Sequence, residues 1–158
     1  MGRASIKENK SPYQEAREQL GLTRAKASEL LECITDTRLE KIESGTYPAH
    51  PDEILVMAEK YNKPELCNYF CVNECPIGNK FVPAVKQKDL PTITLEMLNT
   101  INNLNESKER LVEISVDGQI TEDELTDFKQ IKDNLDKMSD AIESLKLWTM
   151  NAMSNQNK

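Results

Sequence analysis

The chain has 158 residues, enough for one domain or two small ones. Apolar residues make up 38% of it and charged residues 30%, a balance typical of a soluble protein with a core. No apolar run approaches the roughly 20 residues that a membrane span requires, and the N-terminus lacks the apolar segment of a signal peptide. We therefore expect a cytoplasmic protein without membrane contact, whose four cysteines are thiols rather than disulfides.

The net charge of −7 is unevenly distributed along the chain. Residues 1–31 carry six Lys and Arg against four Asp and Glu, a net of +2. Residues 81–158 carry nine Lys and Arg against fourteen Asp and Glu, a net of −5. Because DNA affinity depends largely on Lys and Arg at phosphates, the acidity that opposes DNA binding belongs mainly to the second half.

The first predicted elements are short helices. Residues 1–11 are polar and indicate a flexible N-terminal arm. Residues 12–78 are expected to form a compact all-helical domain.

Residues 21–47 are predicted to form two short helices joined by a tight turn, with a glycine after the second helix. Thr23 and Thr35 are each placed as an N-cap residue, whose hydroxyl accepts a hydrogen bond from a free backbone N–H. Gly45 is placed where a left-handed C-cap is needed. This layout is that of a helix-turn-helix, whose second helix enters the major groove of DNA. The inward apolar faces of the two helices are expected to be Ala27, Leu30 and Leu31, and Leu39 and Ile42.

This part of the chain resembles the Cro/lambda-repressor-type (XRE) DNA-binding domain. The matching residues are Gly21, Leu22, Thr23, Ala27, Leu31, Thr35, Leu39, Lys41, Ile42, Glu43, Gly45 and Pro48. The flanks extend the resemblance to a first helix at 13–20, a fourth at 51–61 and a fifth at 64–71, so that it covers residues 10–78. The ending KIESG with its downstream proline is its most specific part. It implies an all-α, five-helix, lambda-repressor-like domain that binds double-stranded DNA. The turn at residues 32–34 departs from the pattern, because it is one residue longer and lacks a glycine.

The position of the two helices indicates which residues contact DNA. Base edges are usually contacted from the start of the recognition helix, and phosphates from the N-terminus of the preceding helix. Arg38 has the planar fork that can bind guanine through two hydrogen bonds. The acidic side chains of Asp36 and Glu40 are less favourable beside phosphates. The candidate set is Thr23, Arg24 and Lys26 at phosphates, and Thr35, Asp36, Thr37, Arg38 and Lys41 at the recognition helix.

Three cysteines, Cys67, Cys71 and Cys75, lie at i, i+4 and i+8. Such thiolates can share zinc or an iron–sulfur cluster on one helix face, but zinc then needs a fourth ligand, which only Cys33 or His50 offers. The usual zinc pattern has two cysteine pairs separated by a loop. The alternative is that the thiols are small apolar residues lining the fifth helix. We favour this alternative and expect no metal and no cofactor.

Residues 113–124 imitate a calcium loop, with Asp117 and Gly118 at positions five and six and Glu124 at position twelve. Position one is Glu113, where an aspartate is expected, and the chain has no second copy of the loop. We therefore interpret Asp117-Gly118 as the break between two helices.

The second half is predicted to be a linker and a long helical hairpin. Residues 79–93 contain Pro83 and Pro91 and indicate the linker. Residues 94–150 indicate an antiparallel helical hairpin, and residues 151–158 a disordered tail.

Both hairpin helices carry an apolar stripe. The first helix, expected to be capped by Thr94, has Met97, Ile101, Leu104 and Leu111. The second, expected to begin with a capping box at Thr121 and Glu124, has a heptad seam typical of a coiled coil. One interpretation is packing within a single chain; the other adds a second copy, because apolar surface is left over. The expected homodimer contacts are Ile131, Leu135, Met138, Ile142, Leu145 and Trp148.

No catalytic constellation is present in the sequence, and a single histidine leaves little acid–base capacity near neutral pH. We expect the protein not to be an enzyme. The leading hypothesis is a sequence-specific transcriptional regulator of bacterial or phage type, which dimerises through its C-terminal helices and reads half-sites about one helical turn apart or a multiple of that. The alternative is an interaction protein whose head does not bind DNA and whose hairpin binds a protein partner.

Overall fold

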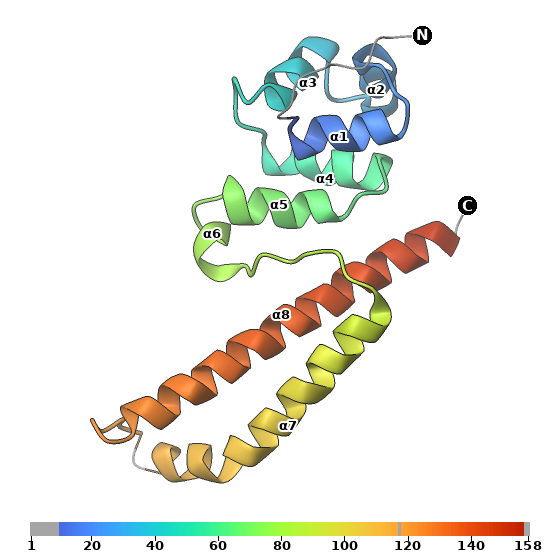
Figure 1. The fold of residues 1–158 in the computed structure, drawn as a ribbon. Helices are drawn as coiled ribbons and strands as arrows, with labels where there is room; N and C mark the ends of the chain where they lie inside the picture. The colour runs from blue at the N-terminus through green and yellow to red at the C-terminus, as the bar shows by residue number, and fades with distance from the viewer. Residues whose placement is uncertain (1–9, 117, 157–158) are drawn as a thin grey trace. The chain divides into compact units, whose positions relative to one another are not determined.

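The computed structural model describes residues 10–116 and 118–156, which form eight α-helices and no strand (Figure 1). The prediction of an all-α fold is confirmed. The described residues divide into two compact units, residues 10–84 with 151–156, and residues 85–116 with 118–150. Within the described residues, no helix is long and apolar enough to cross a membrane.

The head, residues 10–84, contains six helices packed around one core (Figure 1). They are α1 (Pro12–Gln19), α2 (Arg24–Leu31), α3 (Asp36–Glu43), α4 (Pro51–Lys60), α5 (Glu65–Asn73) and α6 (Gly78–Phe81). The sixth helix overlaps the residues expected to be a linker. Leu30, expected on an inward face, is 37% exposed, so that expectation is wrong. The largest core side chains are Tyr13, Leu31, Ile34, Leu39, Ile54, Met57, Tyr61, Leu66 and Phe70.

The ends of α2 and α3 form as their sequences indicate. The hydroxyls of Thr23 and Thr35 each accept a hydrogen bond from the backbone N–H three residues on, at 3.3 Å and 3.2 Å. Gly45 has a φ of +70° and ends α3 with its N–H on the Ile42 carbonyl oxygen at 3.1 Å. Leu39 and Ile42 are 0% and 3% exposed, so their inward direction is confirmed.

The turn between α2 and α3 is closed without a glycine. Glu32 has a φ of +60° and a ψ of −46°, and the Cys33 N–H donates to the Leu31 carbonyl oxygen at 2.6 Å. This is a γ-turn with positive φ, a strained conformation for a residue with a side chain. The Ser28 hydroxyl donates to the Ile34 carbonyl oxygen at 2.8 Å, and Ile34 is buried. Burial of Ile34 therefore holds the longer turn in place despite the strain at Glu32.

The three clustered cysteines lie where α5 packs on α6. Cys67, Cys71 and Cys75 are partly buried against the head core. Burial raises the pKa of the Cys67 thiol, which favours its protonated form. A Cβ at Gly78 would collide with the Cys71 carbonyl oxygen, so only glycine permits this approach of the two helices. These contacts support the interpretation of the thiols as small apolar residues.

The hairpin, residues 85–150, is formed by two antiparallel helices, α7 (Leu90–Ser115) and α8 (Leu125–Gln156) (Figure 1). Thr94 is not the N-cap of α7, because that helix begins four residues earlier. The cap is Asp89, whose carboxylate accepts a hydrogen bond from the Thr92 N–H at 2.9 Å.

The start and end of α8 also differ in part from expectation. The Glu124 carboxylate accepts hydrogen bonds from both the backbone N–H and the hydroxyl of Thr121, at 3.0 Å and 2.8 Å. The predicted capping box is therefore incomplete, because the Thr121 hydroxyl donates instead of accepting and α8 begins only at Leu125. Residues 151–156, expected to be a disordered tail, continue α8 as helix.

We predict that Glu32→Gly stabilises the protein by about 1 kcal/mol, because glycine adopts a positive φ without a side-chain clash. The larger entropy of glycine in the unfolded chain offsets part of the gain. Chemical unfolding followed by circular dichroism measures the difference. Cys33→Gly is the matched control, since Cys33 is exposed and has no positive φ, and it should destabilise by about 0.5–1 kcal/mol. A less stable Glu32→Gly protein would contradict the strain at this turn.

Candidate nucleic-acid interface

The start of α2 and the outer face of α3 adjoin in the head. Arg24, the first residue of α2, places Nη1 3.5 Å from a carboxylate oxygen of Glu40 on α3. Because α3 turns Leu39, Ile42 and Glu43 inward, its other side faces outward. The exposed residues on and beside α3 are Thr35, Asp36, Thr37, Glu40, Lys41 and Ser44.

A buried ion pair fixes α3 against α1 and α2. Arg17 and Glu43 are 5% and 4% exposed, and the Arg17 fork donates to both carboxylate oxygens of Glu43 at 2.5 Å and 2.9 Å. Arg17 also donates to the Leu22 carbonyl oxygen at 2.6 Å, and the Nε of Arg24 donates to Glu43 at 3.0 Å. Hydrogen bonding to Glu43 raises the pKa of Arg17. The same carboxylate therefore orients Arg24 at the surface.

The structure places Arg38 differently from the role assigned to it from sequence. Its Nε and Nη2 donate to the two carboxylate oxygens of Glu53, both at 2.6 Å, and Nη2 also donates to the Pro48 carbonyl oxygen at 2.9 Å. Glu53 in turn accepts a hydrogen bond from the His50 N–H at 2.8 Å. The planar fork is thus occupied within the head. This arrangement argues for Arg38 as a residue that positions the α3–α4 loop rather than one that reads guanine.

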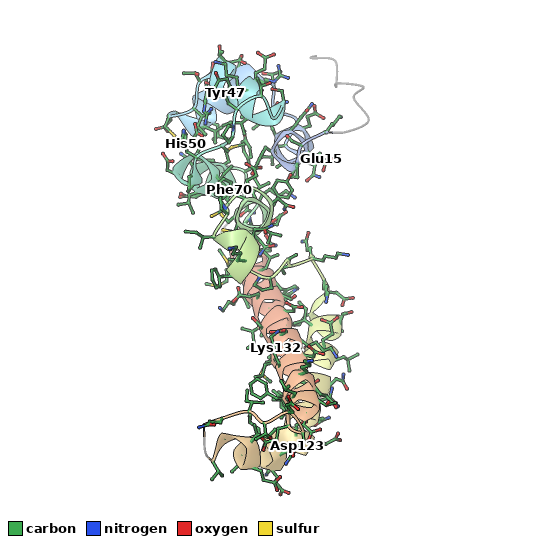
Figure 2. All side chains as sticks on the ribbon, turned by 90° about the vertical axis from the view of Figure 1, so that its left-hand side faces the viewer. Glu15, Tyr47, His50, Phe70, Asp123 and Lys132 are labelled. Atoms are coloured by element: carbon green, nitrogen blue, oxygen red, sulfur yellow. The ribbon has the colours of Figure 1, made fainter. Side chains whose placement is uncertain are left out.

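The loop after α3 supplies surface groups that the sequence did not single out. The Lys41 ammonium lies 5.1 Å from the centre of the Tyr47 ring, a cation–π arrangement. Tyr47 is 54% exposed and lies at the surface of the head (Figure 2). The hydroxyls of Ser44 and Thr46 are 2.7 Å apart. The tyrosine after the glycine cap was the one available signal, since exposed aromatics often mark binding surfaces.

The charge on this surface is mixed. Arg24, Lys26 and Lys41 oppose the exposed carboxylates of Asp36 and Glu40. The third acidic side chain of α3, Glu43, is buried between two arginines and does not add to the surface charge. The surface therefore carries three basic groups against two acidic ones.

The other candidate sites do not assemble from the residues that the structure describes. Among the described residues, no group of three His, Cys, Asp or Glu side chains is placed to hold a metal ion. In the segment that imitates a calcium loop, Asp117 lies outside the described residues. The Glu113 carboxylate accepts a hydrogen bond from Arg110 at 3.0 Å, and the Glu124 carboxylate accepts one from the Thr121 N–H.

We predict that Arg38→Met destabilises the head by about 1–3 kcal/mol at pH 7, because it leaves the Glu53 carboxylate partly buried without its charged partner. The bond from Arg38, aided by the His50 N–H, lowers the pKa of Glu53 from its ordinary value of 4.5. A lowered pKa stabilises the folded state above pH 4.5, and that stability is lost as the pH falls through the folded pKa.

The difference in unfolding free energy between wild type and Arg38→Met should therefore shrink from pH 7 to pH 3. Denaturant titrations at the two pH values measure it. Lys63→Met is the control, because Lys63 forms only a looser pair with Glu65 at 3.5 Å. A difference that does not change with pH would contradict the stabilising contact between Arg38 and Glu53.

Comparisons with known proteins agree with this geometry for one part of the chain. Residues 14–66 match a family model described as helix-turn-helix. No curated protein and no solved structure matches the chain. The matched residues include all of α2 and α3, their turn and the buried pair of Arg17 with Glu43. The resemblance to a helix-turn-helix family that the sequence indicated is therefore confirmed for residues 14–66, about a third of the chain.

Proposed function

We propose that the protein is a sequence-specific DNA-binding transcriptional regulator that works as a homodimer joined through its C-terminal helices. The main support for DNA binding is that the outer face of α3 is exposed beside the capped N-terminus of α2. These are the two elements from which helix-turn-helix proteins contact bases and phosphates.

The start of α2 has the chemistry for a phosphate. The Thr23 hydroxyl occupies the Lys26 N–H, which leaves the first backbone N–H groups of the helix available to an anion. Arg24 is held over α3 by Glu43, and Lys26 is exposed. Both side chains can neutralise the backbone of a duplex.

Base reading is assigned to exposed residues of α3. With Arg38 bound to Glu53, the exposed groups proposed to read bases are Asp36 and Thr37 in the first turn of α3 and Lys41 in its last turn. A lysine donates to guanine, an aspartate accepts from the cytosine amino group, and the methyl of a threonine packs on the thymine methyl. The short threonine and the two charged groups therefore define the proposed specificity.

The runner-up function is an interaction protein. It is favoured by the net charge of −7 and by the exposed carboxylates of Asp36 and Glu40 on the recognition helix. In that case the head binds a protein and the acidic hairpin carries a protein partner. Salt dependence separates the two functions, because phosphate binding weakens steeply with added salt.

We predict that Lys26→Ala weakens binding to all duplexes similarly and lowers the salt slope by about 1, because it removes one phosphate contact. Lys41→Ala should instead cost about 1–3 kcal/mol at the preferred sequence and relax preference at one position. Fluorescence titration against sequences selected from a random pool measures both. Lys80→Ala is the control, since Lys80 is an exposed lysine of α6 outside the proposed surface. Absence of binding to any duplex at low salt would exclude the DNA-binding function.

A second prediction concerns the coupling of two heads. Removal of residues 85–158 leaves the head with its own core and should give a helical monomer. Its affinity for a two-half-site duplex should fall by about 10²–10⁴-fold, because a linked second head binds at high effective concentration. On a single half-site the truncated and full chains should bind alike, and this duplex is the control. Equal affinities on both duplexes would show that the heads act singly.

A further inference from the structure

The hairpin leaves large apolar side chains exposed while it buries polar ones. Thr100, Asn134 and Ser144 are 4–6% exposed. Meanwhile Ile101 and Val112 of α7 are 39% and 63% exposed, and Leu135 and Ile142 of α8 are 47% and 39% exposed. An apolar surface of this kind marks a contact with another molecule.

These apolar residues share one side of the hairpin. On the other side, a shallow polar groove is lined by Glu96 and Asn103 of α7 and by Gln130 and Lys137 of α8. Each residue of an α-helix points about 100° further round the helix axis than the residue before it. In two antiparallel helices, the residues that follow the groove residues therefore point to the same side of the pair, away from the groove. The residues one position after the groove are Met97, Leu104, Ile131 and Met138.

We define the apolar face by its most exposed members, Ile101, Val112, Leu135 and Ile142, with Leu104 and Met138 half-buried between them. The face extends for about 25 Å along two helices, each about 10 Å wide, since a helix rises 1.5 Å per residue. Two such faces bury about 1,000 Å² together, the lower limit for a specific interface. On α7 the exposed Lys108 lies between Ile101 and Val112, whereas Leu135 and Ile142 are neighbours on α8. Because a two-fold contact joins the same surface of both partners, a second copy of this chain can cover the face.

Charge along the hairpin favours one direction for that second copy. The turn end, residues 109–127, carries seven acidic residues and one basic one, a net of −6. Asp123 lies in this end (Figure 2). The open end, residues 85–100 and 140–150, carries four acidic and three basic residues, a net of −1. A parallel pair would place the two acidic turns side by side, whereas an antiparallel pair separates them.

We propose that two copies pack these apolar faces together, with the hairpins antiparallel, into a four-helix bundle. The inference rests on the homodimer of the proposed function and adds the face and the direction. It also changes the contact set expected from sequence. Ile131, 2% exposed, belongs to the inner seam of one hairpin, whereas Ile101 and Val112 of α7 join the contact.

The first test is the mass of the full chain without DNA, measured by sedimentation at tens of micromolar. Wild type should sediment as two chains, and the double variant Leu135→Glu with Ile142→Glu as one chain with unchanged helicity. The control, Thr126→Glu with Gln130→Glu, adds the same charge to exposed positions of α8 on the groove side and should remain two chains. A wild-type monomer, or a dimeric Leu135→Glu and Ile142→Glu protein, would overturn the inference.

The second test measures direction. A ketone-bearing residue at position 120, which is 44% exposed near the turn, takes a spin label without modifying the native cysteines. In an antiparallel pair the two labels should lie about 40 Å apart or more, the length of α7, and in a parallel pair within about 20 Å. A short distance would overturn the antiparallel arrangement. Neither test uses DNA. Their results therefore do not depend on whether the head binds a duplex.

Discussion

The buried pair of Arg17 and Glu43 is the interaction on which the head depends. A carboxylate at the C-terminal end of α3 faces the negative end of the helix dipole and loses its water on burial. Two arginines from α1 and α2 offset both costs by hydrogen bonds to Glu43. Because the pair sits where three helices meet, it fixes the rotation of α3. That rotation determines which of its residues face outward.

Once α3 is fixed, the roles of its other charged residues follow. Arg38 lies on the side of the helix that faces α4, where Glu53 and the Pro48 carbonyl occupy its fork. Lys41 lies on the outer side beside Tyr47. The proposed division between a positioning arginine and a reading lysine is thus a consequence of helix rotation. It is the reason why we propose Lys41 rather than Arg38 as a base-reading residue.

The hairpin depends on a different constraint. It buries Ile93, Ile114 and Ile131 together with polar Thr100 and Asn134, while apolar residues of both helices stay exposed. Covering the exposed apolar face would add to the stability of the hairpin. We infer that association of two chains completes the core of this unit, as in four-helix bundles.

The sequence alone determined α2 and α3, because N-cap threonines, a glycine C-cap and apolar spacing are local signals, whereas α6 was missed. The same signals placed Thr23, Lys26 and Thr37 at the proposed DNA surface, and periodicity predicted the two hairpin helices.

The roles of Arg38 and Glu53 were decided only by tertiary structure, because their contact joins residues 15 positions apart through a loop. The start of α7 at Leu90 was missed, because Pro91 reads as a linker signal although proline is well tolerated in a first helical turn. Only the tertiary structure shows that Ile131 is buried inside the hairpin while Leu135 and Ile142 are exposed. A heptad pattern gives the spacing of apolar residues but not which side of the helix faces its neighbour.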